Sequence, residues 1–328
     1  MNNPNLKPID YLEVLVIVDN TTDSLSTNPD NVSSEWKYLK QKGRLTELSG
    51  KATCCAHHGL SLLITAHQGS ASHSLLFDTG PDALTYMRNV EILGVDHASV
   101  SSIVFSHGHW DHGAGLVPAI EACAKERKNK QVDCFVHPDM FAERGMMKSD
   151  GKIERFESVP DPDAFIRAGA NVVNSRAPQL ISDNMFFISG EIPRVTRYET
   201  GFPGHMRREP GTDSWQPDPL IMDERFVAVN IKDKGILVFS GCSHAGVVNV
   251  LTHAREVFPE IPIYGVCGGL HLAGNNEGII PETVKGLKKF DLALIAPGHC
   301  TGWRAVNALA DKFVNKLVPL AVGKHFEI

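Results

Sequence analysis

Short apolar runs separated by polar, glycine-containing turns dominate the first third of the chain. They cover residues 12–18, 60–65, 74–77 and 101–105 and are rich in Val, Ile, Leu and Phe. Runs of this length between turn residues are typical of buried strands. Apolar residues at helical spacing follow in 113–127, and 132–136 is another apolar run. The order strand, loop, helix and strand predicts an α/β unit.

The last third repeats this arrangement. Residues 226–230 and 236–239 predict a hairpin around a turn at 232–235, and residues 263–266 and 292–295 predict two further strands. Helices are expected over 245–258, 282–290 and 305–316. Two such halves fit an α/β sandwich of two mixed sheets, with helices on both outer faces.

The stretch from about residue 145 to residue 219 differs from both halves, because it is polar and rich in proline and glycine. Only residues 184–188 predict a clear strand there. Long connections of this kind are usually functional loops. We interpret the stretch as an insertion or lid within a single domain that spans residues 1–328.

The amino-acid composition limits the kinds of molecule with which the protein is expected to associate. The chain has 328 residues, of which 42% are hydrophobic, so it can bury a sizeable core. A formal net charge of −6 gives no reason to expect a nucleic-acid partner, because phosphate binding needs concentrated Lys and Arg. Seven scattered cysteines, no signal peptide and no long apolar segment favour a cytoplasmic protein without membrane association. The sequence leaves the oligomeric state open.

The strongest chemical signal is SHGHWDHG at residues 106–113, between a predicted strand and a predicted helix. It places His107, His109, Asp111 and His112 within six positions. A loop that leaves a rigid strand can direct the first two side chains to one metal ion and the last two to a second. These ligands suit two divalent ions, preferably Zn²⁺, with Mn²⁺ or Fe²⁺ as alternatives.

The HxHxDH pattern after a strand resembles the hallmark of the metallo-β-lactamase superfamily, and DTG at 78–80 and APGH at 296–299 resemble further landmarks of that superfamily. The resemblance implies an αββα sandwich with a mono- or dinuclear metal site at one sheet edge. Within the superfamily, the chain is most similar to the branch of dihydropterin-ribofuranosylaminobenzene-phosphate synthases. The motifs that carry this closer likeness are HHGLS (57–61), SGEIPR (189–194), GCSHAG (241–246), GGLH (268–271) and PGHCTG (297–302).

The resemblance also implies metal ligands outside the motif. His244 and His299 follow predicted strands, and we expect both to bind metal. Many members of the superfamily have a bridging Asp where this chain has Cys242. A thiolate of Cys242, His244 or water alone could therefore form the bridge, and we favour His244 because a neighbouring cysteine is more often a small buried residue.

Other side chains are expected to support the site. For the third ligand of the first ion the chain offers Asp223, Glu224 and His205, and the sequence does not choose between them. Substrate contact or support of the ligands is the role expected of His58, Asp78, Cys242 and His271. His137 is expected in the core or at the rim.

The expected chemistry is hydrolysis of a small molecule, because bound metal ions lower the pKa of water and polarise a carbonyl or phosphoryl oxygen. Asp111 would serve as both ligand and base. The closer resemblance implies an alternative, a transferase that condenses a pterin diphosphate with an aryl ribofuranosyl phosphate. Arginines 194, 197, 207 and 208 would then hold phosphate groups.

Two other classes are less expected. An iron redox protein of this superfamily usually has Glu where this chain has His109, and it carries a flavodoxin-like domain. A serine hydrolase built on GCSHAG, with Asp291 and His299, would need glycine where the chain has Ala245.

Overall fold

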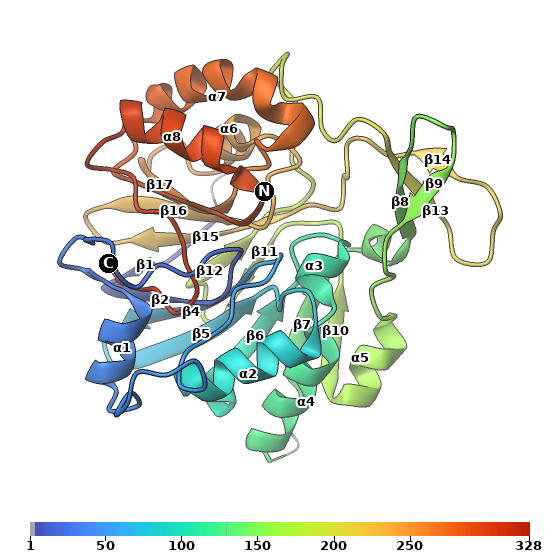
Figure 1. Cartoon of the computed structure of the whole chain (residues 1–328). Coiled ribbons are helices and arrows are strands. Elements are labelled where there is room, and N and C mark those ends of the chain that lie inside the picture. The colour runs from blue at the N-terminus through green and yellow to red at the C-terminus, as the bar shows by residue number, and fades with distance from the viewer. Residues whose placement is uncertain (1–3, 129) are drawn as a thin grey trace.

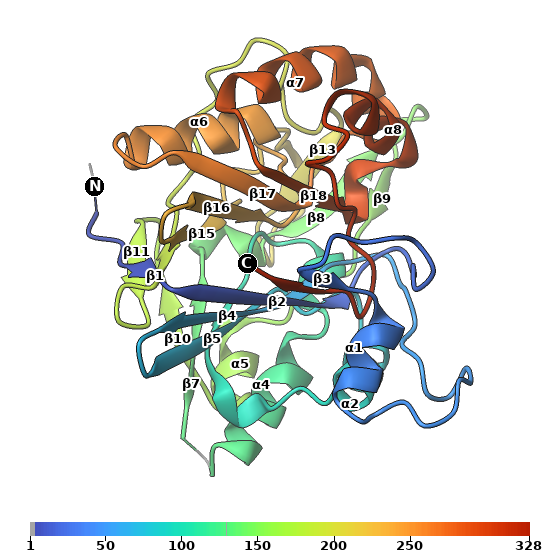
Figure 2. The ribbon, with the colours of Figure 1, turned by 90° about the vertical axis from the view of Figure 1, so that its left-hand side faces the viewer.

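Two β-sheets lie face to face in the middle of the molecule, with helices outside both of them (Figures 1 and 2). The computed structural model describes residues 4–128 and 130–328. The first sheet has eight strands in the order β10, β7, β6, β5, β4, β2, β19 and β3. Their bounds are Ala170–Asn174, Val132–Val136, Val100–Val104, Ala71–Phe77, Ser61–Gln68, Tyr11–Val18, His325–Glu327 and Val32–Ser33.

The second sheet has seven strands in the order β11, β12, β15, β16, β17 and β18, with β1 paired to β15. Their bounds are Gln179–Ile181, Phe186–Ile188, Phe226–Ile231, Gly235–Ser240, Ile263–Gly269, Leu294–Gly298 and, for β1, Pro8–Ile9. Strands β16, β17 and β18 are parallel, as are β5 and β6, so the carboxyl ends within each set lie at one edge of their sheet.

Three apolar layers hold the sandwich together. The inner layer lies between the sheets and includes Val16, Phe77 and Phe239. Helices α6 (Val247–Val257), α7 (Ile280–Leu287) and α8 (Trp303–Lys312) cover the outer face of the second sheet. Helices α1 (Glu35–Gln41), α2 (Ala83–Leu93), α4 (Leu116–Glu126) and α5 (Pro162–Ala168) lie on the other side, outside the first sheet. The predicted αββα sandwich is confirmed.

Residues 145–219 contain more structure than the sequence predicts. Strands β10, β11 and β12 from this range join the main sheets. Strands β8 (Glu143–Met147), β9 (Ile153–Arg155), β13 (His205–Arg208) and β14 (Gln216–Pro217) form a third sheet, which projects at the right of Figure 1. The expectation of one clear strand is wrong, because the others are too short or too polar to produce an apolar run. The role of the range as a lid stays a prediction.

The strand expected at 184–188 also begins later than the apolar run does. Ser182, Asp183 and Asn184 have φ angles of 51°, 55° and 65°. This left-handed backbone forms the turn between β11 and β12, so the strand starts only at Phe186. No helix among the described residues combines the length and the apolar character that a membrane span needs.

Candidate metal centre

The HxHxDH loop leaves the end of β6 and continues into the short helix α3 (Trp110–Gly113). Gly108 packs against the backbone of Met140 so closely that a Cβ atom there would overlap the Met140 carbonyl oxygen. Its N–H also donates to the Asp223 carboxylate at 2.8 Å. The glycine between the first two histidines is therefore required by a close backbone approach.

Asp78 fixes this loop from the end of the neighbouring strand β5. Its carboxylate accepts hydrogen bonds at 2.7 Å from the Ser106 N–H, the Ser106 hydroxyl and His112 Nδ1. Asp78 is fully buried and has a φ of 57°, a strained conformation for a non-glycine residue. Asp78 therefore ties Ser106 and the His112 ring to the end of β5.

Three imidazoles form a first group of potential ligands. His107 Nε2 lies 3.0 Å from His109 Nδ1 and 3.2 Å from His244 Nε2. His244 comes from the turn that follows β16, whose glycine, Gly241, leaves no room for a side chain beside Ser106. All three histidines are buried.

A second group lies next to the first. His112 Nε2 is 3.1 Å from His299 Nε2, and His299 Nε2 is 3.2 Å from Asp111 Oδ2. Asp111 Oδ2 is 3.8 Å from His112 Nε2. His299 follows β18 and has a φ of 51°, which turns its side chain back toward the motif. The structure therefore brings the six residues expected to bind metal into two adjacent triads.

Hydrogen bonds to residues around the two triads determine which nitrogen of each imidazole ring carries the proton. His112 Nδ1 faces the Asp78 carboxylate, so a neutral His112 keeps its proton on Nδ1 and leaves Nε2 bare. Ser106 gives its own proton to Asp78 and accepts from His107 Nδ1 at 2.9 Å, which leaves Nε2 of His107 bare as well. His299 Nδ1 donates to Asn20 Oδ1 at 3.0 Å, with the same result.

In His109, too, the nitrogen that faces the centre carries no proton, because the other ring nitrogen is hydrogen-bonded to a second histidine. The Asp218 carbonyl oxygen accepts from His205 Nδ1 at 2.8 Å, so neutral His205 has a bare Nε2. That atom lies 3.0 Å from His109 Nε2 and accepts its proton. The Nδ1 atom of His109 is then bare and faces His107.

The proton positions on these rings determine whether the residues fit a metal ion. In the neutral rings, the bare nitrogens of His107 and His109 lie 3.0 Å apart, and those of His112 and His299 lie 3.1 Å apart. Two lone pairs at such distances repel each other unless a proton or a cation lies between them. Donors directed at one another, held by buried partners, are the arrangement that a divalent ion requires. The ligand set fits the metals expected from the sequence.

The electrostatics of the site agree with this fit. Burial lowers the pKa of His107, His109 and His244 well below the ordinary imidazole value, which favours the neutral rings that bind metal. Burial also opposes a charge on His112, but the carboxylates of Asp111 and Asp78 outweigh it and raise its pKa to about 9. The second triad therefore favours a positive charge at its centre.

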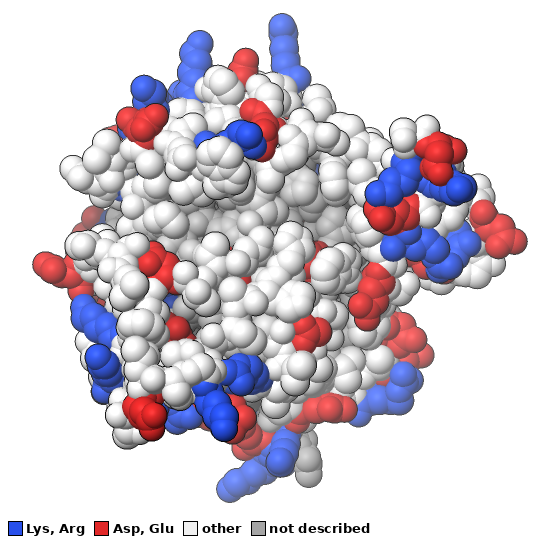
Figure 3. Space-filling model, viewed as in Figure 1, with Lys and Arg blue, Asp and Glu red and all other residues white. Residues whose placement is uncertain are grey.

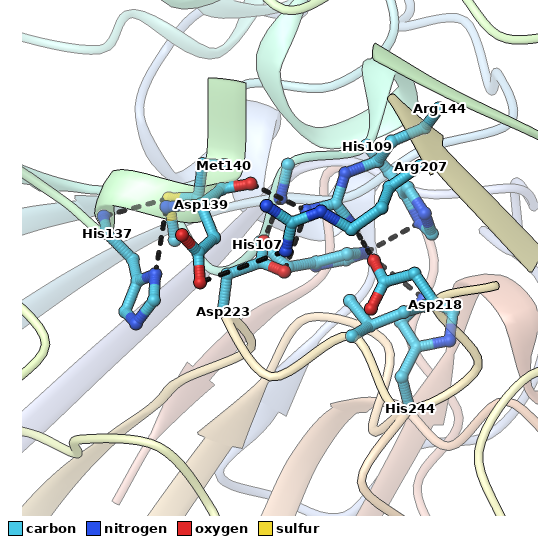
Figure 4. Close-up of polar contacts among 12 residues, drawn as sticks. His107, His109, His137, Asp139, Met140, Arg144, Arg207, Asp218, Asp223 and His244 are labelled. Carbon is cyan, nitrogen blue, oxygen red and sulfur yellow. Dashed lines mark hydrogen bonds and ion pairs between the residues drawn. The ribbon is translucent and has the colours of Figure 1, made fainter. Parts of the chain in front are cut away.

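Asp223 and Glu224, two of the three candidates for an additional ligand, are engaged elsewhere. Asp223 accepts from Gly108 N–H and, at 2.7 Å, from a guanidinium nitrogen of Arg144 (Figure 4). The Glu224 carboxylate accepts from the backbone N–H groups of His244 and Ala245, each at 2.7 Å. In this structure both carboxylates support the loops that carry the histidines.

A cavity of about 600 Å³ opens above the two triads. His58, His271 and Cys242 line it, together with the aromatic side chains of Trp110, Phe156 and Phe202. His58 Nε2 lies 3.4 Å from Asp111 Oδ2, and the His271 ring centroid lies 4.2 Å from that of His244. The structure thus places His58, His271 and Cys242 at the cavity.

The two arginines of β13 pair with nearby carboxylates and do not line the cavity. Arg207 pairs with Glu209 and Arg208 with Glu143. Figure 3 shows both signs of charge gathered on this sheet at the right of the molecule. Neither arginine lines the cavity, and the lining contains no lysine or arginine.

Sequence reasoning missed three contributors to the site: Asn20, Ser106 and Cys300. Asn20 follows the apolar run of β2, and a polar residue at the end of a buried strand is a signal that could have found it. Ser106 and Cys300 each adjoin an assigned histidine. His137 is fully buried, and its Nδ1 accepts from the Asp139 N–H at 3.2 Å, in agreement with a core position.

Comparison with known proteins agrees with this fold. The chain is 28% identical over 275 residues to the 7,8-dihydropterin-6-methyl-4-(β-D-ribofuranosyl)-aminobenzene-5'-phosphate synthase of Methanocaldococcus jannaschii, covering 82% of this chain and 89% of that protein. An uncharacterised protein of the same organism is 29% identical over 269 residues, covering 82% of this chain and 93% of that protein. No model of a known protein family matches the chain.

Among solved structures, a metal-dependent hydrolase of the β-lactamase superfamily superposes with a TM-score of 0.71 at 22% identity. The superposition covers 97% of this chain and 99% of the other. The chain has the metallo-β-lactamase fold, and its sequence is similar to that of the synthase over most of both chains, in line with the resemblance of its motifs.

Proposed function

We propose that this metallo-β-lactamase-fold protein is an enzyme that uses two divalent ions, preferably zinc, to hydrolyse a small-molecule substrate. One triad, His107, His109 and His244, would hold the first ion, and the other, Asp111, His112 and His299, would hold the second. The observation that carries the proposal is the set of ring nitrogens directed at one another at 3.0 to 3.2 Å. Bound ions would supply a water of lowered pKa and a Lewis acid for the scissile group.

We assign to Asp111 the role of the base that accepts the proton of the attacking water. Its Oδ2 atom belongs to the second triad and lies on the cavity wall, where it can hold the attacking water and accept its proton. His58 Nε2, 3.4 Å from that oxygen, is half exposed and offers a path for the proton to solvent. His58 is therefore a relay candidate and not a ligand in this proposal.

The cavity wall suggests a substrate with a flat, apolar part. Trp110, Phe156 and Phe202 offer ring faces and edges against which such a group packs. Because the lining contains no lysine or arginine, a phosphate of the substrate would have to be held at the metal centre itself. An aryl ester, an aryl-substituted lactone or an aryl phosphodiester has such a flat group, and its carbonyl or phosphoryl oxygen would lie at the metal centre.

A second candidate is the transferase reaction of the synthase branch. The 28% identity to the synthase over most of both chains supports it. A cavity of about 600 Å³ is also large enough for two ring systems. The same centre would then hold the diphosphate of a pterin while an aryl ring, instead of water, attacks.

One screen separates the two candidates. The zinc-loaded protein is offered aryl esters, lactones, phosphodiesters and a pterin diphosphate, the last with and without an aryl ribofuranosyl phosphate. Turnover without the aryl acceptor supports hydrolysis, and a condensed product that forms only with it supports transfer. Chelation should abolish either activity, and Asp111→Asn should lower kcat by about 10² to 10⁴. Activity that survives chelation, or survives His107→Ala, would contradict both.

A further inference from the structure

We propose that Cys242 supplies a thiolate that bridges the two metal ions, with Cys300 as its hydrogen-bond donor. The inference rests on the two-ion function proposed above and adds its bridging ligand. The bridge would then be sulfur, in place of the His244 bridge favoured from the sequence.

The position of the Cys242 sulfur carries the proposal. Cys242 Sγ lies 3.2 Å from His112 Nε2, in the second triad. It also forms, with His107 and His112, a group whose potential ligand atoms all lie within 4.8 Å of one another. Since His107 belongs to the first triad, one sulfur atom lies within reach of both ions.

Two further groups agree with a position between the triads. The same 4.8 Å limit joins Cys242 to His244 and His271 on one side and to His299 and Cys300 on the other. His244 is a member of the first triad and His299 of the second. A ligand atom that approaches both triads in this way occupies the place of a bridge.

The donor atoms around the proposed second ion lie slightly closer to one another than the ligands of a tetrahedral zinc ion. With Zn–N near 2.0 Å and Zn–S near 2.3 Å, neighbouring ligand atoms stand roughly 3.3 to 3.8 Å apart. His112 Nε2 lies 3.2 Å from Cys242 Sγ and 3.1 Å from His299 Nε2, and His299 lies 3.2 Å from Asp111 Oδ2. All three distances fall just short of that range, so a small outward movement of the side chains would let Cys242 serve as a fourth ligand.

The backbone holds Cys242 firmly in this place. Gly241 before it packs against the Ser106 hydroxyl, and Ser243 after it has a φ of 60°. The Ser243 hydroxyl donates to the Gly269 carbonyl oxygen at 2.7 Å, which ties the turn to β17. The turn therefore presents Cys242 and His244 together, on one rigid support.

The surroundings of Cys242 differ from those of a cysteine that only fills the core. Cys134 and Cys267 belong to the apolar layers. Cys242 is equally buried, but its sulfur contacts an imidazole nitrogen and, at 3.3 Å, the sulfur of Cys300. A thiol of Cys300 at this distance can donate to a thiolate of Cys242.

This arrangement has a chemical consequence. The thiol of Cys242 must lose its proton to solvent when the ions bind, and the resulting Zn–S bonds replace an S–H bond. Thiolate is a soft ligand that favours Zn²⁺ and Co²⁺ over Mn²⁺. The bridge would thus select the metal as well as hold it.

X-ray absorption of the zinc-loaded full chain tests the bridge. We expect about one sulfur neighbour per zinc at about 2.3 Å. Cys242→Ser should remove that sulfur, whereas Cys300→Ser should keep it and serve as the matched control. Cys242→Asp should keep the zinc, lose the sulfur and raise the affinity for manganese relative to zinc by at least about tenfold.

Cobalt-loaded wild type gives a second readout that needs no variant, since a thiolate ligand produces sulfur-to-cobalt charge-transfer absorption in the near ultraviolet. Two zinc ions without a sulfur neighbour, or a sulfur that persists in Cys242→Ser, would overturn the bridge and leave the proposed function standing. Wild type that binds no zinc would overturn both.

Discussion

The proton positions of the histidines are set by residues that do not touch the proposed ions. Asp78 and Ser106 orient the rings of His112 and His107, and Asn20 orients His299. Such partners raise the basicity of a ligand and hold it in the binding orientation. The function of each motif residue therefore depends on a second residue distant in the sequence.

His205 is the partner whose role is easiest to test. It accepts the proton of His109 Nε2, so its loss would free His109 to turn or to adopt the other tautomer. We expect His205→Ala to weaken zinc binding by about 10- to 100-fold. His205→Gln, whose amide oxygen can still accept that proton, should recover part of the loss. Competition with a chromophoric chelator measures both affinities.

Two outcomes would count against this role. Unchanged zinc affinity in His205→Ala would show that the hydrogen bond does not support His109. Complete loss of one ion, without recovery by His205→Gln, would instead make His205 a ligand, as the sequence left open.

At this scale, the sequence predicts ligand types but not their partners. The spacing of His107, His109, Asp111 and His112 was sufficient to propose the motif. Which of Asp223, Glu224 and His205 is free to bind metal depends on hydrogen bonds to Arg144 and to the turn after β16. No local sequence pattern predicts these hydrogen bonds.

At the scale of elements, strands with long apolar runs were predictable from the sequence, and short polar strands were not. Helix α2 was missed although its signals were present, since Asp82 caps its first turn by accepting from the Thr85 N–H, and Gly94 ends it at a φ of 70°. Strand β13, with the sequence HMRR, has no apolar alternation because both of its neighbours belong to the small third sheet. Its pairing comes from tertiary structure alone.

A cross-strand group on the first sheet makes stability depend on pH. Glu13 on β2 lies 3.3 Å from His325 on β19 and 3.0 Å from His67 on β4. The contact with His325, helped by His67 and opposed by burial, lowers the pKa of Glu13 from 4.5 to about 2. Because the pKa is lower in the folded chain, this contribution is complete above pH 4.5 and is lost as the pH falls toward 2.

Urea unfolding of the metal-free protein measures this contribution. Glu13→Gln should be less stable than wild type near pH 5.5, and the difference in the free energy of unfolding should shrink as the pH falls through that window. A difference that stays constant down to pH 3 would show that the charge of Glu13 does not stabilise the sheet.

At the scale of the molecule, the site gathers at one edge of the sandwich. The loops that follow β2, β5 and β6 come from the first sheet, and those that follow β16, β17 and β18 come from the second. The sequence predicts this meeting of strand ends only through the resemblance of its motifs. Nothing local could indicate that Cys300, at the end of β18, would lie 3.3 Å from Cys242, at the end of β16.

Metal removal should therefore destabilise the whole fold. The triads join both sheets, so ions that bind only the folded chain add RT ln(1 + [L]/Kd) to its stability. At free zinc 1,000 times the Kd, we expect about 4 kcal/mol per site. Calorimetry over a series of buffered zinc concentrations measures the rise in Tm. A Tm that does not change with zinc would mean that no ion is held between the sheets.

The central claim is that two triads each hold one ion, and metal content per chain tests it most directly. We expect about two zinc ions in wild type and about one in each of His244→Asn and His299→Asn. His137→Asn, which changes a buried histidine at another strand end, should keep both ions. Wild type without bound metal, or equal loss in the His137 control, would contradict the account.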